Sequence, residues 1–347
     1  MMAEALAEAG HQVTYITNNR PVFYDDFSSY PSHDKIDLCL TRDFFWDLPP
    51  GGFDILFLVP RRDRNPDFFL KAQLLAQLRG TRLASLSFET PNWFNELAPR
   101  AHDLELWKHW KLCCRKADLV LSFTAEGVKY ARKYFNHEED QARHTFCYPP
   151  INSIVADAIG DLPREKRIVL FARFGNTEHK GTNQFHELFC EQMRGYTLGM
   201  VTGGVRATDE IMGAIEERAR CYGVKIELLQ RLTDEEKFRY IKRSRLLLFP
   251  SFFEGFGLPP VEAQYCNVPC IAFDLPVLRE VNGDGIAYVK PGNWGAFRQI
   301  IGQVLSSGRS HDHLREGIAH VARFEAYVER MNRVALDLVS ARGLVTV

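Results

Sequence analysis

Short apolar runs alternate with longer amphipathic stretches along this chain. The runs have the length and composition of buried strands, and the stretches between them have the spacing of apolar residues that is typical of helices. Strands that alternate with helices in this way usually pair in parallel and are covered by helices on both faces of the sheet. Strands are predicted in the runs at 11–17, 53–59, 82–88, 118–123, 167–172, 198–202, 224–229, 245–249 and 270–273.

The segment YPPINS, at 148–153, separates two such series of strands. The chain has 347 residues with 46% hydrophobic content, which is sufficient for two substantial cores. We therefore predict an α/β protein with two doubly wound domains, at 1–152 and 153–325. The remaining residues, 326–347, are predicted to continue an amphipathic terminal helix.

Two glutamates, Glu254 and Glu262, stand eight positions apart in the run FPSFFEGFGLPPVEAQYCNVPCIAF. The apolar residues on either side predict a strand, a loop, a helix and a second strand. The two consecutive prolines suit the first turn of that helix, which is predicted to end at Cys266. The backbone N–H groups of the turn before it, together with the helix dipole, favour an anion such as phosphate.

A loop that places carboxylates beside an anion site suits a ligand with both hydroxyl and phosphate groups, such as a nucleotide sugar. Glu262, in the first turn of the helix, would accept hydrogen bonds from a ribose diol, and Glu254 would accept them from sugar hydroxyls. The alternative is that both acids only cap and stabilise the start of a helix. The spacing alone leaves both interpretations open.

Three further segments precede EGFGLPPVEA, namely KRIVLFARFGNTEHKG, TLGMVTGGV and DEEKFRYIKRSRLLLFPS. In this order they resemble the donor-binding domain of the retaining GT-B glycosyltransferases of family 4, and the likeness runs through 166–292. The resemblance implies a GT-B fold, in which two facing Rossmann-like domains have a cleft between them. It also implies that the terminal helix crosses back onto the first domain, whereas an ordinary terminal helix would pack on its own domain.

The resemblance implies a role for each matching residue. Arg173, Lys180 and Glu254 would be catalytic: the two cations would bind the diphosphate, and the acid would orient the hexose. Glu262 would bind the ribose. The other donor-binding residues would be the glycines after one strand and the turn before the helix, at Gly203, Gly204, Gly255, Phe256, Gly257 and Leu258.

The implied reaction moves a hexose from a nucleoside diphosphate sugar to a glycan, lipid-linked or small-molecule acceptor, with retention of anomeric configuration. It would need no metal and no other cofactor, because the cations and backbone amides stabilise the departing diphosphate. In such enzymes the leaving phosphate takes the proton of the acceptor. This agrees with the lack of an obvious pair of base and nucleophile here.

Two other positions bear on the substrates. Family members often have a histidine after a strand where this chain reads SLSFETPNWF, and Glu89 is the candidate acceptor-side acid there. Its alternative is an acid at the start of a helix. The nucleobase of the donor is expected to bind near Gln230 and Arg231. These two residue types do not show whether that nucleobase is uracil or guanine.

The start of the chain departs from the family. MAEALAEAGHQVTYIT resembles the end of the first helix and the second strand, so the first strand and its glycine-rich loop have no counterpart, and we expect a truncated sequence. That strand is central in a doubly wound sheet. Its loss is expected to leave unpaired edges on two strands.

The composition bears on which partners the protein can bind and on the compartment in which it works. A net charge of −1 argues against nucleic acid as a main partner. The eight cysteines lack the spacing of a disulfide framework or a zinc site, which favours plain thiols in a reducing cytoplasm. His311 and His313 have no further ligand nearby in sequence, so a solvated loop is the better interpretation.

Membrane contact is a separate question. No apolar run approaches the ~20 residues that span a bilayer. The helical segment ELWKHWKLCCRK, with Trp107 and Trp110, suits a weak peripheral contact at the inner face of a membrane. The stronger alternative is that both tryptophans pack on the sheet.

Two other functions stay open beside the glycosyltransferase. One is a catalytically incomplete subunit that binds a nucleotide sugar, which the missing strand favours. The other is a sugar-nucleotide epimerase of the same fold, which would act on the donor alone. A nicotinamide dehydrogenase is disfavoured, because no glycine fingerprint follows an early strand.

Overall fold

The computed structural model describes residues 1–21, 24, 30–43, 45, 52–62, 64–98, 101–136, 143–175, 178–307 and 311–340. The chain divides into two compact units, of which the first comprises Met1–Glu96, Ala101–Pro150 and Phe324–Val347. The second is chiefly Ile151–Arg323, so the division falls within the YPPINS segment. The segments that leave and re-enter the first unit lie side by side, since the Ile151 N–H donates to the Ala322 carbonyl at 3.0 Å.

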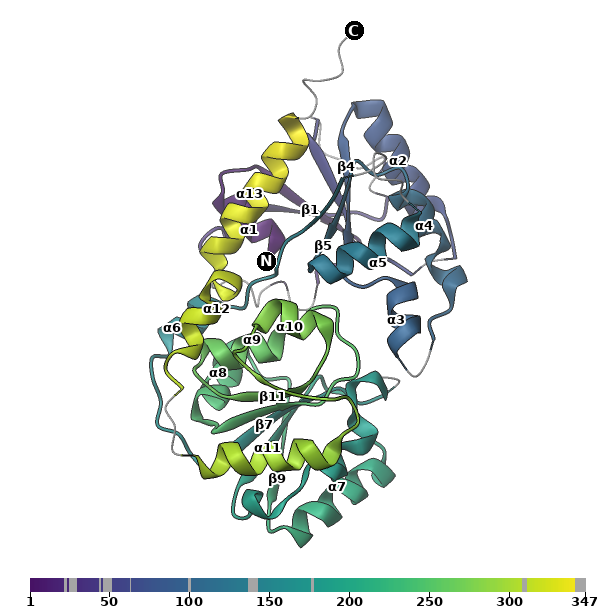
Figure 1. The fold of residues 1–347 in the computed structure, drawn as a ribbon. Coiled ribbons are helices and arrows are strands. Elements are labelled where there is room, and N and C mark those ends of the chain that lie inside the picture. The colour runs from purple at the N-terminus through teal and green to yellow at the C-terminus, as the bar shows by residue number, and fades with distance from the viewer. Residues whose placement is uncertain are drawn as a thin grey trace. The chain divides into compact units, whose positions relative to one another are not determined.

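The strands of the first unit are parallel but form two sheets. They are β1 (Val13–Thr17), β2 (Ile36–Leu40), β3 (Ile55–Leu58), β4 (Arg82–Ser87), β5 (Leu119–Ser122) and β6 (Arg143–Phe146). β1 pairs with β2, and the other sheet has the order β3-β4-β5-β6 (Figure 1). Among the described strands, β1 and β3 are each paired on one side only, which confirms the two unpaired edges that the sequence predicted.

Helices connect and cover these strands, and they include the last helix of the chain. They are α1 (Met2–Glu8), α2 (Asp67–Arg79), α3 (Pro91–Leu97), α4 (Lys108–Cys114), α5 (Ala125–Phe135) and α13 (Phe324–Ser340). α13 packs beside α1, and Asn332 on it forms a 2.8 Å hydrogen bond with His11. The Arg330 guanidinium donates to the Tyr148 carbonyl at 3.2 Å. The terminal helix thus belongs to the first unit.

Trp110, on α4, lies in the core of the first unit and is fully buried. Its indole N–H donates to the Ser85 hydroxyl on β4 at 3.2 Å, and its ring meets Phe135 edge to face. Trp107 packs against the same core. The stronger of the two interpretations of this helix is therefore correct, and Trp110 is not available to a lipid surface.

The second unit has one parallel sheet whose strand order reverses at its centre. The strands are β7 (Arg167–Ala172), β8 (Thr197–Thr202), β9 (Lys225–Gln230), β10 (Leu246–Phe249), β11 (Cys270–Phe273) and β12 (Ala287–Val289). Their order is β12-β11-β10-β7-β8-β9. β8 and β9 are added on one side of β7, and β10 to β12 are added on its other side, so the strand order reverses between β7 and β10. In open sheets of this kind, ligands bind outside the carboxyl ends of the strands at that switch point.

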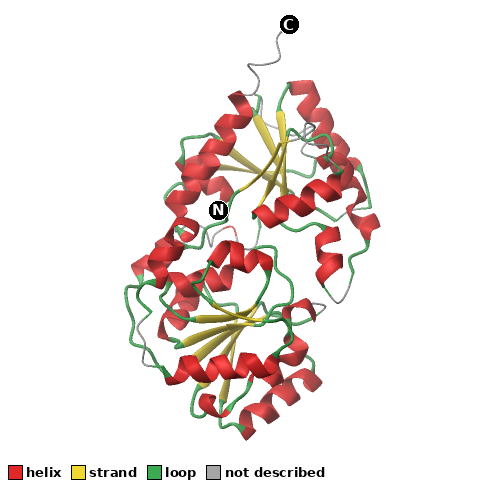
Figure 2. Ribbon diagram, in the orientation of Figure 1, coloured by secondary structure: helices red, strands yellow, loops and turns green. Residues whose placement is uncertain are grey.

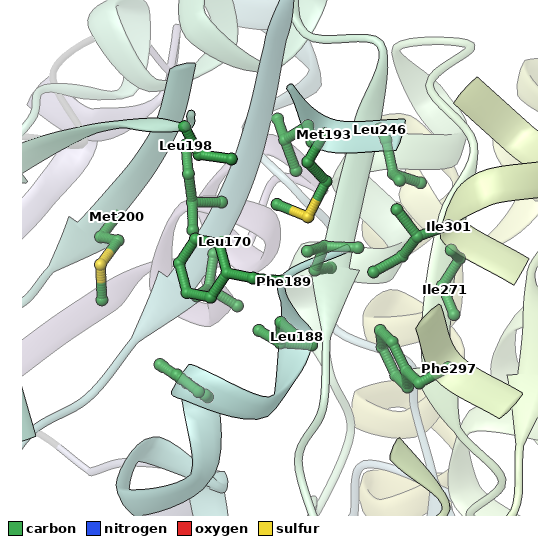
Figure 3. Packing of buried hydrophobic residues seen from close by; sticks show 14 of the residues in the cluster. Leu170, Leu188, Phe189, Met193, Leu198, Met200, Leu246, Ile271, Phe297 and Ile301 are labelled. Carbon is green, nitrogen blue, oxygen red and sulfur yellow. The ribbon is translucent and has the colours of Figure 1, made fainter. Parts of the chain in front are cut away.

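Helices lie on both faces of this sheet (Figure 2). They are α6 (Ser153–Ala158), α7 (Asp209–Cys221), α8 (Asp234–Arg243), α9 (Leu258–Tyr265), α10 (Pro276–Asn282), α11 (Trp294–Ser306) and α12 (Leu314–Ala322). Alternate residues of a strand face one side, and Ile168 and Leu170 of β7 belong to one buried cluster. Leu170 lies there with Phe297 and Ile301 of α11 (Figure 3). Apolar residues on both faces explain the nearly continuous apolar runs of the sequence.

Gly199 on β8 is predicted to be indispensable for packing on the opposite face. A Cβ at this position would lie 2.1 Å from the hydroxyl oxygen of Tyr240, a buried residue of α8. That hydroxyl also donates to Glu227 at 3.0 Å. We expect Gly199→Ala to lower the free energy of unfolding by about 1–3 kcal/mol, because the ring must move and lose this bond.

The matched control is Gly213→Ala on α7, where a Cβ meets nothing within 4 Å. Alanine in a solvent-exposed helix is expected to raise the free energy of unfolding by about 0.5–1 kcal/mol. Urea denaturation of both variants measures the difference. Equal stability of the two would contradict the packing argument.

Candidate functional site

The glutamate motif forms the connection from β10 to α9, at the carboxyl end of a strand beside the switch point. α9 begins at Leu258 and ends at Tyr265 with Cys266 as its C-cap, as the prolines predicted. Its N-cap is Gly257, which has φ +90° and makes no side-chain cap. A Cβ there would lie 2.5 Å from Leu278, so glycine is required both for its conformation and for its size.

The segment after β7 docks onto this connection through its backbone. It contains the short turn η4 (Glu178–Lys180). The Phe252 N–H donates to the His179 carbonyl at 2.8 Å. Gly181, with φ +74°, lies so close that an added Cβ would be 2.3 Å from the Pro250 carbonyl oxygen. The close approach explains why the Lys-Gly pair of the sequence needs its glycine.

This docking brings two of the predicted catalytic residues into contact. The Lys180 ammonium donates to a Glu254 carboxylate oxygen at 2.7 Å and to the Phe253 carbonyl at 3.2 Å. The side chains are 17% and 11% exposed, so the pair is largely screened from water. An ammonium group has three donors, so a third can serve an anion beside the start of α9.

Glu262 lies on the buried side of α9, and one prediction about it was wrong. It is 5% exposed and it is not in the first turn, which contains no acidic residue, because the helix begins one residue before the two prolines. A helix-capping role is therefore excluded for this acid. One of its carboxylate oxygens accepts from Lys237 of α8 at 2.7 Å.

Lys237 also pairs with Asp234 at 2.6 Å, so one ammonium group bridges two carboxylates. Burial alone would lower the pKa of Lys237, but attraction to Glu262 and then to Asp234 outweighs burial and raises it. Lys237 stays charged at neutral pH. Neither Lys237 nor Asp234 was among the predicted site residues, and the only sequence signal was the acidic start of a predicted helix.

The other predicted donor-side residues lie at the same edge of the sheet. Arg173 directly follows β7 and is exposed, and Gly203 directly follows β8. Gly204, with φ +90°, lies beside Arg231, whose Nε would be 3.2 Å from an added Cβ. Since β10, β7 and β8 are neighbours, the loops after all three strands meet at one edge.

Glu89 is exposed and lies just after β4, in the first unit. Within the described ranges, no group of three or more His, Cys, Asp or Glu side chains is arranged to hold a metal ion. The cysteines of the described ranges are free, and burial raises the pKa of Cys113 and of Cys266 to about 12.

Comparison with known proteins finds a family that resembles the second unit. The model of the glycosyl transferases group 1 matches residues 160–320, which contain every donor-side residue described above. This match covers slightly less than half of the chain, and we call the matched segment the group 1 domain. This group 1 domain therefore coincides with the sheet that carries the switch point.

Relatives of known activity match part of this chain. An O-antigen chain mannosyltransferase of Salmonella typhimurium is 34% identical over 113 residues, which are 31% of this chain and 29% of the relative. An O-antigen chain mannosyltransferase of Escherichia coli is 33% identical over 127 residues, which are 36% of this chain and 33% of the relative. The chain thus matches about a third of the length of these relatives.

Solved structures extend the likeness to both units. Sucrose-phosphate synthase from Thermosynechococcus elongatus superposes with a TM-score of 0.73 at 18% identity, over 98% of this chain and 92% of that one. An Anabaena protein solved with UDP and glucose has a TM-score of 0.65 at 13% identity, over 98% and 95%. The fold of this chain is therefore GT-B, as predicted. Among the described helices, none is long and apolar enough to cross a bilayer.

The close approach at Gly181 generates a stability prediction. Gly181→Ala would force the η4 segment away from the Pro250 carbonyl and would also place alanine in the left-handed region. We expect the free energy of unfolding to fall by about 2–4 kcal/mol, as the sum of both effects.

Gly195→Ala is a matched control, because Gly195 has a similar φ of +77° but nothing within 4 Å of an added Cβ. Its expected loss is about 1 kcal/mol, from the backbone conformation alone. Urea denaturation separates the two effects. A loss at Gly181 no larger than at Gly195 would show that the docking is loose.

Proposed function

We propose that this protein transfers a hexose from a nucleoside diphosphate sugar to a glycan acceptor, with retention of anomeric configuration and without a metal. The observation that carries the proposal is the Lys180–Glu254 pair at the start of α9, beside the switch point of the group 1 domain. It sets a cation from the loop after β7 against a carboxylate in the loop before α9, next to the backbone of the turn from Gly255 to Leu258. That combination suits a diphosphate linked to a sugar.

The leaving diphosphate gains negative charge as the glycosidic bond breaks. Lys180, Arg173 and the amides from Gly255 to Leu258 would stabilise this charge. Each such donor, held in place before the reaction, typically lowers the barrier by ~3 kcal/mol. Glu254, held by Lys180, would orient the hexose through its second carboxylate oxygen, and the leaving phosphate would accept the proton of the acceptor.

The finer assignments rest on the relatives. Two of them are O-antigen chain mannosyltransferases, which favours mannose as the hexose and a polysaccharide, free or lipid-linked, as the acceptor. The structure solved with UDP supports a nucleoside diphosphate as the leaving group. We also propose assignment to family 4, an acceptor site near Glu89, and action in the cytoplasm.

A binding subunit without transferase activity is the second candidate. The division of the first unit into the sheets β1-β2 and β3-β4-β5-β6 favours it, because a doubly wound domain places its substrate-facing loops along one continuous sheet. Such a subunit would bind a nucleotide sugar and release no product. An epimerase would convert the donor in the absence of any acceptor, so analysis of the donor after incubation alone distinguishes the three.

The first test removes one acid and one cation. Glu262→Ala and Arg173→Ala are each expected to lower the release of GDP or UDP from sugar nucleotides by at least about 100-fold, since each removes a donor or acceptor for the nucleotide. Glu216→Ala and Arg220→Ala, on the exposed face of α7, are the matched controls and should change it less than twofold. Unchanged turnover in both site variants would exclude the proposed reaction.

The second test concerns stereochemistry and metal. NMR of the first product formed from an α-linked sugar nucleotide is expected to show the α-anomer, and EDTA is expected to leave the rate unchanged within twofold. Manganese and magnesium are added back separately as controls. A β-linked product would exclude retention, and loss of activity in EDTA that either metal restores would exclude the metal-free reaction.

A further inference from the structure

Lys237 occupies a fixed position at the start of α8. A capping box begins this helix: the Thr233 hydroxyl accepts from the Glu236 N–H at 3.2 Å, and the Glu236 carboxylate accepts from the Thr233 N–H at 2.8 Å. Asp234, three residues before Lys237, accepts from the Asn152 amide at 2.8 Å. The first turn of α8 therefore has little freedom, and Asp234 and Lys237 share one face of it.

That face meets α9, and Lys237 is the group that joins the two helices at Glu262. The ammonium lies 2.7 Å from one Glu262 oxygen and 2.6 Å from one Asp234 oxygen. The lysine side chain is 18% exposed and the Glu262 side chain 6%. Among the described residues, Lys237 is the cation within ion-pair distance of Glu262.

Glu262 needs this cation more than an acid at a helix start would. It lies beyond the first turn of α9, where the stabilising effect of the helix dipole has fallen off. A carboxylate that is almost fully buried is costly unless it is paired. The pairing also fixes orientation, because one oxygen is committed to Lys237 while the second keeps its lone pairs for another donor.

We propose that Lys237 is a positioning residue that holds Glu262 ready to accept the two ribose hydroxyls of the donor, and so makes the site selective for ribonucleotides. This rests on the proposed function, in which Glu262 binds the ribose. Lys237 acts through Glu262 and does not itself contact the reacting atoms. The Glu262 carboxylate is already held in place by Lys237 before the nucleotide binds. None of the binding free energy is therefore lost in immobilising that carboxylate.

The test compares nucleotides that differ only in the ribose hydroxyls. GDP and UDP, and their 2′,3′-dideoxy forms, are titrated calorimetrically into the wild-type chain, Lys237→Met and Lys237→Arg. The wild type is expected to bind the dideoxy form of its nucleotide at least tenfold more weakly than the ribonucleotide. Lys237→Met is expected to bind the ribonucleotide about tenfold more weakly and the dideoxy form unchanged. Lys237→Arg should recover part of the loss, because it keeps the charge.

Arg239→Met is the matched control, since Arg239 lies on the same helix and pairs with Glu235 at an exposed position. This variant should bind GDP, UDP and their two dideoxy forms as tightly as the wild type does. Lys237→Gln provides a second neutral variant if Lys237→Met does not fold, and urea denaturation shows which variants are native.

The outcomes separate the two levels of the proposal. If the wild type binds neither GDP nor UDP, or binds the ribonucleotide and its dideoxy form equally, the proposed role of Glu262 fails, and the role of Lys237 fails with it. If the wild type discriminates and the folded Lys237 variants discriminate equally well, only the positioning role is overturned. An equal loss for both nucleotide forms would also overturn it, because a purely structural lysine would produce that result.

Discussion

The docking of residues 178–181 onto the loop between β10 and α9 is the interaction on which the charged site depends. It is made by backbone groups, through the His179 carbonyl and the contact of Gly181 with the Pro250 carbonyl. Because backbone contacts of this kind tolerate no added side chain, they fix Lys180 within reach of Glu254. The reversal of strand order between β7 and β10 makes the two loops neighbours in the first place.

The two glutamates of the motif are each matched by a lysine from a different segment. Lys180 comes from the loop after β7 and Lys237 from α8. This division places a separate cation beside each acid, one before α9 and one within it, and so limits the negative charge near a phosphate group bound before α9. Under the proposed function, each acid that serves sugar hydroxyls therefore has an ammonium group beside it, which reduces its repulsion of a nearby phosphate.

Much of this arrangement could be predicted from the sequence, because it depends on local patterns. The alternation of apolar runs predicted nine of the twelve described strands, all except β2, β6 and β12, and the Gly-rich turn with its prolines predicted α9. The pairing of Glu262 with Lys237 could not be predicted, since it depends on how α8 packs against α9, and an acidic helix start reads equally well as a solvated face. The position of Glu262 within α9 was misjudged because helix boundaries shift by a residue or two with the geometry of the cap.

The chain passes between the two units twice, next to Ile151 and next to Ala322, and this affects the order in which the units can fold during synthesis. The second unit is chiefly one continuous stretch of chain, whereas the first also needs α13, which is synthesised after that stretch. Domains generally fold as units during synthesis. The group 1 domain can thus reach its native state before α13 is synthesised. Until then α1, which is synthesised early, lacks the helix that packs against it.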